Sequence, residues 1–363
     1  MTDLCDVTIR ESEQLPGRSY DLEAKREAGR ALDDLGVAFV QVGFPITGKT
    51  DRRAVATLAD ELEADIVAIA RTLDRDVDAA IESGADVIEV FAPLSTRHLE
   101  TTLDTDRETA FDRMRRAVDR AAASGATVHL SIMDAFRTAD EHVDRAIDRF
   151  EDVAVVTLAD TVGAMAPLAL EQRLGALVDS GVDPDRLGVH LHDDLGVATA
   201  NALVAARHDV GRLDVSVASL GERAGNPALE EVAIHCDREG YAELGLETAE
   251  LVPRCEDVLA ALEEPVDERK AVLGRDVFEH ESGLHTAAML RDPSTFEPFD
   301  PETYGGERSL VFGAGSGSGA ARALLEAAGV EATDARVETI LSALEREGPV
   351  DLEGALELAR DEQ

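Results

Sequence analysis

The feature that most constrains this chain is the alternation of eight short apolar runs with longer amphipathic stretches. Runs rich in valine and isoleucine are typical of buried parallel strands, and the stretches between them have the spacing of helices packed on a sheet. Eight such units in about 250 residues predict a closed (β/α)8 TIM barrel. The expected strands are residues 7–10, 38–45, 66–70, 86–92, 127–133, 153–158, 187–192 and 213–218.

The stretches between the runs carry helix signals. Residues 21–35 place Leu22, Ala28 and Leu32 on one face and stop at Gly36, a typical C-cap. The expected helices 107–124 and 167–180 also end at a glycine. An open doubly wound sheet is the competing fold, but the number of units and the lack of a GxGxxG motif after the first strand favour the barrel.

The pattern changes after residue 253, so we expect two domains: a barrel over 1–253 and a smaller, mostly helical region over 254–363. Residues 313–319 (GAGSGSG) read as a flexible loop. Helices are expected at 320–328 and 334–346, the second with Thr333 or Asp334 as its N-cap.

Composition limits the partners and the environment. Hydrophobic residues are 44% of the 363, which supports a large core despite a net charge of −40. The excess carboxylates repel nucleic acid and anionic lipid, so neither is an expected partner. No transmembrane run or signal peptide is apparent, and three distant cysteines fit a reducing cytoplasm. The basic residues are nearly all arginine, with lysine only at Lys25, Lys49 and Lys270.

The seventh expected strand carries a candidate metal site. His190 and His192 are two residues apart, so their side chains point to the same face at the rim where barrel enzymes place their chemistry. Together with Glu11, which follows the first strand, they can hold one divalent cation. Two core histidines bonded to backbone are the alternative, but the spacing and the rim position favour metal. Such ligands suit Zn²⁺, Mn²⁺ or Fe²⁺, and Mg²⁺ with added waters.

Charged residues beside this pair extend the site. Arg10 next to a cation indicates that an anionic ligand binds there, and a salt bridge between the first two strands is the alternative. Asp194 is the expected N-cap of a helix over 195–208. Asp193 either shares that cap or orients a ligand histidine.

Four segments carry a family resemblance: DVTIRESEQ at 6–14, HLHDDLG at 190–196, LGERAGNPALE at 220–230 and HESGLH at 280–285. They resemble, in order, the motifs of the DRE-TIM metallolyase superfamily, in its branch of homocitrate, 2-isopropylmalate and citramalate synthases. The resemblance spans residues from about 5 to 325. Ser12 in place of the motif's glycine, and GAGSG at 313–317 where relatives often have GKHSG, are departures from the pattern.

The resemblance implies a Claisen-type acyltransferase that condenses acetyl-CoA, its co-substrate, with a 2-oxo acid held on a divalent metal (Zn, Mn, Mg or Fe). It also implies a homodimer in which a C-terminal lid reaches the neighbouring subunit's site. The implied roles are metal ligands (Glu11, His190, His192, Asn226), catalytic residues (Arg10, His280, Glu281) and substrate contacts (Arg137, Thr161, Glu222).

The oxo acid is the open question in this resemblance. Glu11, where isopropylmalate synthases have Asp, favours homocitrate synthase and 2-oxoglutarate over 2-oxoisovalerate or pyruvate. Sequence alone assigns no basic residue to the distal carboxylate. A 3-hydroxy-3-methylglutaryl-CoA lyase and a non-catalytic metal-binding module are further alternatives.

The charge excess generates a salt prediction. We expect the free energy of unfolding to rise with KCl concentration, because salt shortens the Debye length from about 10 Å at 0.1 M to about 3 Å at 1 M and so weakens carboxylate repulsion. Chemical denaturation followed by circular dichroism measures this. The acidic composition is typical of halophilic proteins, which stay hydrated and soluble in high salt. Full stability in dilute buffer would contradict this interpretation.

Overall fold

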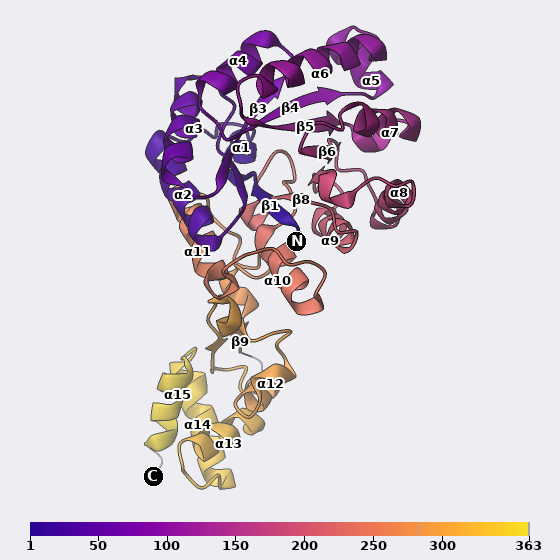
Figure 1. The fold of residues 1–363 in the computed structure, drawn as a ribbon. Coiled ribbons are helices and arrows are strands. Elements are labelled where there is room, and N and C mark those ends of the chain that lie inside the picture. Colours follow the sequence, from indigo (N-terminus) through magenta and orange to yellow (C-terminus); the bar gives the residue numbers. More distant parts are fainter. Residues whose placement is uncertain (282, 362–363) are drawn as a thin grey trace. The chain divides into compact units, whose positions relative to one another are not determined.

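The computed structural model describes residues 1–281 and 283–361. Its first compact unit, Met1–Pro265, is the expected (β/α)8 barrel: eight parallel strands close because β1 pairs with both β2 and β8. Helices surround the strands (Figure 1). The strands are β1 Asp3–Asp6, β2 Phe39–Gln41, β3 Asp65–Arg71, β4 Val87–Pro93, β5 Thr127–Met133, β6 Val155–Asp160, β7 Leu187–Leu191 and β8 Arg212–Val215.

Helices connect the strands and cover the barrel. The predicted C-cap is confirmed, since Gly36 ends α2 with a φ of 92°. At the start of this helix Asp21 accepts a hydrogen bond from Ala24 N at 2.9 Å. The helices are α1 Thr8–Ser12, α2 Leu22–Leu35, α3 Lys49–Glu61, α4 Asp74–Glu82, α5 Thr96–His98, α6 Arg107–Ala122, α7 Asp140–Arg149, α8 Pro167–Asp179, α9 Ala198–Arg207, α10 Leu229–Glu239 and α11 Leu251–Ala261.

The first strand lies earlier than the sequence predicted. The expected strand over 7–10 is wrong, because β1 ends at Asp6 and residues 8–12 form the short helix α1. The Asp6 carboxylate accepts hydrogen bonds from Thr8 N at 2.9 Å and Thr8 Oγ1 at 2.8 Å, which turns the chain out of the strand. Val7 and Ile9 are nevertheless buried, so the apolar pattern continues past the strand end.

A buried lysine joins the loops beside the barrel mouth. The Lys25 side chain is fully buried, and its Nζ donates to Glu13 Oε2 at 2.7 Å, Asp51 Oδ1 at 2.8 Å and Val42 O at 3.0 Å. A buried ammonium requires such partners. Lys25 therefore ties α2 to the segments that follow α1 and β2.

The second unit begins at Val266, beyond the expected boundary after residue 253, because α11 packs against α2 of the barrel. Helices α12 Gly283–Met289, α13 Ser318–Ala327, α14 Asp334–Glu347 and α15 Leu352–Arg360 accompany a parallel pair, β9 Glu279–His280 with β10 Ser309–Leu310. This unit has its own core, which includes Phe312, Leu324 and Leu344. Thr333 caps α14 as expected. None of the described helices has the length and apolarity needed to cross a membrane.

The turn at the end of β1 generates a pH prediction. Asp6 is fully buried, and this burial, only partly offset by the Thr8 hydrogen bonds, raises the pKa of Asp6 from 3.8 to about 7. The folded state then binds the proton more tightly than the unfolded state. The resulting stabilisation is complete below pH 4 and is lost as the pH rises through about 7.

We therefore expect the wild type to lose stability relative to Asp6→Asn as the pH rises from about 4 to about 7. Above pH 7 the difference between their free energies of unfolding should become constant. Denaturant titrations at constant ionic strength measure this difference. A difference that stays constant with pH would contradict the raised pKa.

Candidate metal centre

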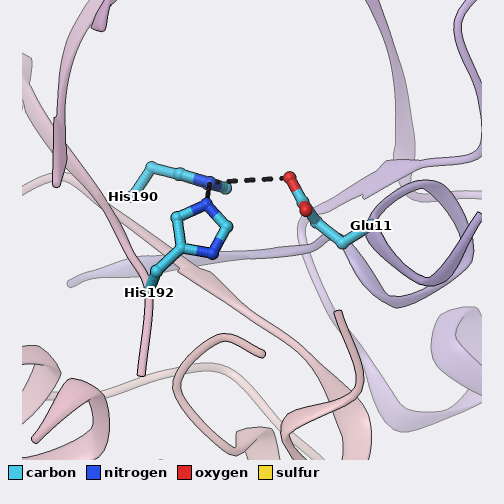
Figure 2. A group of neighbouring side chains, drawn as sticks. All are labelled: Glu11, His190 and His192. Carbon is cyan, nitrogen blue, oxygen red and sulfur yellow. Dashed lines mark hydrogen bonds and ion pairs between the residues drawn. The ribbon is translucent and has the colours of Figure 1, made fainter. Parts of the chain in front are cut away.

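Two histidines and one glutamate converge at the carboxyl rim of the barrel. His190 lies in β7 and His192 just beyond it, while Glu11 lies in α1 after β1. His190 Nε2 is 3.3 Å from His192 Nε2 and 3.5 Å from Glu11 Oε1. Figure 2 shows the three side chains facing one another. One ligand atom from each of the three residues lies within 4.8 Å of the other two, and all three residues are buried.

The protonation states suit a cation. His190 Nδ1 is 2.9 Å from Asp214 Oδ2, so Nδ1 carries the proton and Nε2 offers its lone pair toward Glu11. Burial, together with the neighbouring His190, lowers the pKa of His192 to about 3, so this imidazole is neutral. Burial opposes the charge on Glu11, but Arg10 and the two histidines lower its pKa below the ordinary value.

Asn226 presents an oxygen that has no protein partner. Its Nδ2 donates to Leu191 O at 2.9 Å, which turns Oδ1 the other way. Oδ1 is buried and unpaired among the described residues. A Cβ at Gly221 would lie 2.2 Å from this oxygen and 3.3 Å from Glu11 Cβ, so only glycine leaves the space between them open. An unpaired amide oxygen at this place is compatible with the role of a fourth ligand.

Arg10 contacts the site directly. Its Nη1 pairs with Glu11 Oε1, and its Nε donates to Gln41 Oε1 in β2 at 2.8 Å. The link between Arg10 and the second strand is thus a hydrogen bond to an amide and not the salt bridge considered as the alternative. Arg10 lines a pocket of about 540 Å³ together with the three clustered residues.

Of the expected substrate contacts, Thr161 and Glu222 line this pocket and Arg137 does not. Arg137 instead binds Asp134, with Nε–Oδ1 at 2.6 Å and Nη2–Oδ2 at 3.0 Å. The Asp134 N–H in turn donates to Thr161 Oγ1 at 2.8 Å. The Thr161 hydroxyl therefore has its own proton left to donate into the pocket.

His280 and Glu281 belong to the second unit. His280 lies in β9, and its Nε2 is buried without a partner among the described residues. Burial lowers the pKa of His280 below the ordinary value. A Cβ at Gly313 would lie 3.2 Å from Glu281 Oε1, so this carboxylate is next to the glycine-rich loop. Ser282, within the same motif, lies outside the described residues.

Of the two aspartates after β7, Asp193 has one of its two expected roles and Asp194 does not. Asp193 Oδ1 accepts from Ala198 N at 2.7 Å and so caps α9, whereas Asp194 pairs with Arg223 at 2.8 Å. The N-cap prediction for Asp194 is therefore wrong. The residue that orients His190 is Asp214, which the sequence analysis missed. An aspartate in the middle of the apolar run of β8 was the signal that identifies it.

Comparison with known proteins defines the class. The family model described as HMGL-like matches residues 2–258, and the chain belongs to this family. A second model, described as homocitrate synthase post-HMGL domain-like, matches residues 272–348.

Curated relatives place the chain within the synthase branch. Homocitrate synthase AksA of Methanopyrus kandleri is 38% identical over 94% of this chain and 87% of its own length. Homocitrate synthase of Frankia alni is 38% identical over 89% of this chain and 92% of its own length. A putative (R)-citramalate synthase CimA of Methanopyrus kandleri is 36% identical over 94% of this chain and 68% of its own. The resemblance inferred from the motifs is confirmed.

A solved structure shares the barrel. The HMG-CoA lyase of Bacillus subtilis aligns with a TM-score of 0.65 over 74% of this chain and 96% of that one. At 19% identity this similarity concerns the fold alone.

The clustered ligands generate a binding prediction. We expect His192→Ala to lower the divalent metal that remains after dialysis, because a closed site loses one of its few ligand atoms. Elemental analysis measures the metal content per chain. The control is His235→Ala, at an exposed position on α10. Wild-type metal content in the His192 variant would argue against ligation.

Proposed function

We propose that the chain is a metal-dependent acyltransferase that condenses acetyl-CoA with a 2-oxo acid, with 2-oxoglutarate as the acceptor, as in a homocitrate synthase. The observation that carries the proposal is the convergence of Glu11, His190 and His192 beside Arg10 in one pocket. The homocitrate synthases among its relatives support it, since they align over most of their own length.

The residues present fit a divalent cation. Glu11, His190 and His192 would hold it, with the unpaired Asn226 oxygen as a fourth ligand. Two nitrogens and two oxygens suit Zn²⁺, Mn²⁺ or Fe²⁺, and Mg²⁺ with bound water. When bound, the cation would polarise the carbonyl of the oxo acid.

The protein's own groups then have separate tasks. The Thr161 hydroxyl donates to the substrate carboxylate, and Arg137 acts through Asp134 by holding Thr161 in place. Glu222 forms part of the pocket wall. Arg10 stabilises the oxygen that becomes negative when the methyl carbon of acetyl-CoA attacks C2 of the oxo acid and the carbonyl electron pair moves to that oxygen. Water then cleaves the thioester and releases free CoA.

The base that takes the methyl proton is assigned to His280, assisted by Glu281. A histidine with a lowered pKa is unprotonated at neutral pH and can accept a proton. Because the motif resemblance implies a lid that serves a neighbouring subunit, the proposal includes a homodimer.

The setting proposed for this enzyme is a cytoplasm of high salt. A net charge of −40 on 363 residues supports this. Such a surface holds water and counter-ions and keeps the chain soluble where salt screens its self-repulsion.

A thiol-release assay tests the function. Acetyl-CoA is supplied with 2-oxoglutarate, 2-oxoisovalerate, pyruvate or oxaloacetate in the presence of Mn²⁺ or Zn²⁺. Release of CoA that depends on 2-oxoglutarate supports the proposal, and release with pyruvate or 2-oxoisovalerate identifies a citramalate or isopropylmalate synthase activity instead. No release with any oxo acid would overturn the synthase assignment.

The role given to Arg10 generates a kinetic prediction. Arg10→Ala should fold and lose at least about 100-fold in kcat, because the negative oxygen loses a charged donor. Arg120→Ala on α6, which removes a surface pair with Asp78, is the matched control. Near wild-type turnover in the Arg10 variant would refute the assigned role.

A further inference from the structure

Arg212 is a fully buried cation inside the barrel that the proposed reaction does not use. It begins β8, its side chain has no solvent exposure, and it does not line the pocket. Its Nε donates to Asp214 Oδ1 at 2.8 Å, and its Nη1 lies 2.6 Å from Glu89 Oε2 in β4. Because β4 and β8 lie opposite each other in the closed strand order, this side chain crosses the barrel interior.

One branch of contacts leads from Arg212 to the metal site. The Asp214 oxygen that Arg212 leaves free, Oδ2, binds His190 Nδ1 at 2.9 Å. Asp214 is therefore fixed on both oxygens, by Arg212 on one and by His190 on the other. The direction in which His190 Nε2 points depends on this carboxylate, and so on the guanidinium that holds it.

A second branch leads from Arg212 to Arg10. Glu89 Oε2, which pairs with Arg212, also accepts a long hydrogen bond of 3.5 Å from Gln41 Nε2. Gln41 Oε1 then accepts from Arg10 Nε at 2.8 Å. Since Arg10 pairs with Glu11 and Glu11 faces His190, the two branches close into a ring that runs through the barrel interior.

His129 fixes the guanidinium from a third side. Its Nδ1 lies 2.8 Å from Arg212 Nη1, and because arginine only donates, His129 must accept. Burial and the charge of Arg212 lower the pKa of His129 to about 3, so it remains a neutral acceptor. Nε and Nη1 of Arg212 therefore each donate to an acceptor at a fixed position. The remaining nitrogen, Nη2, is buried without a partner in the described chain.

We propose that Arg212 is a positioning residue that holds His190 through Asp214 and Arg10 through Glu89 and Gln41. Stability alone does not require a charge here, since a buried ion pair often can be replaced by apolar residues of similar volume without loss. The planar guanidinium of Arg212 reaches two carboxylates on different strands at once, which the single ammonium of a lysine cannot do with the same geometry. The inference rests on the proposed function, because it explains why His190 and Arg10 must be held in place.

Two variants separate the branches. Arg212→Lys keeps the charge but loses the fork, so both branches relax. Glu89→Gln has nearly the same shape but removes the charge that Arg212 and Gln41 share, which weakens the branch to Arg10, while Asp214 keeps its arginine and its histidine. Leu58→Ala, a cavity variant in the buried face of α3, is the destabilised control, on a helix that carries no member of the ring.

Mn²⁺ affinity by calorimetry and kcat with KM are measured for each variant at a temperature where circular dichroism shows it folded. We expect Arg212→Lys to bind Mn²⁺ at least about 10-fold more weakly and to lose kcat. Glu89→Gln should keep its Mn²⁺ affinity within about twofold and lose about 10-fold or more in kcat, because Arg10 is misplaced. Leu58→Ala should match the wild type in Mn²⁺ affinity and kcat.

The outcomes are distinct. Wild-type Mn²⁺ affinity and kcat in Arg212→Lys overturn the inference, as does an equal loss in Leu58→Ala, which would show a general effect of stability. If Arg212→Lys does not fold, an unchanged kcat in Glu89→Gln overturns it. A wild-type chain that binds no Mn²⁺, Zn²⁺ or Fe²⁺ overturns the proposed function as well, whereas normal wild-type binding with an insensitive Arg212 variant overturns the inference alone.

Discussion

Closure of the barrel between β1 and β8 is the constraint on which the candidate site depends. Glu11 and His190 are far apart in the chain, and they meet only because β8 hydrogen-bonds to both β1 and β7. The same pairing sets Asp3 opposite Arg212 and Asp6 opposite Val215, which fixes how far α1 stands above the rim. A register error at this seam would separate the carboxylate from the imidazoles.

The barrel interior is unusually polar next to the pocket, which Glu89 itself helps to line. A barrel of this size fills its interior with side chains, and branched apolar residues ordinarily dominate there. Here side chains from strands β2, β4, β5 and β8 pair with one another, and among the described residues Nη2 of Arg212 is left without a partner; the side chains are Arg212, Asp214, Glu89, His129 and Gln41. This makes the floor of the pocket a charged, directional support, while apolar contacts between helices and strands hold the outer layer.

Periodicity predicted the parts of the molecule that repeat, and it missed the parts that depend on single hydrogen bonds. The strand spacing of two placed His190 and His192 on one face, and that prediction does not depend on strand bounds. The first strand was misplaced because Val7 and Ile9 stay buried in a turn that the Asp6–Thr8 contacts create. Asp214 was not predicted as a site residue because site residues were sought at strand ends, and Asp214 lies within β8.

The burial of Lys25 has a practical consequence. It leaves one exposed lysine in the barrel, Lys49, and one partly exposed lysine in the second unit, Lys270, among three lysines in the whole sequence. Once the α-amino group of Met1 is blocked, reagents that modify side-chain amines would therefore attach one fluorophore to each unit. Energy transfer between the two dyes would report distances between the units in solution, with and without substrates, and would require no engineered cysteines.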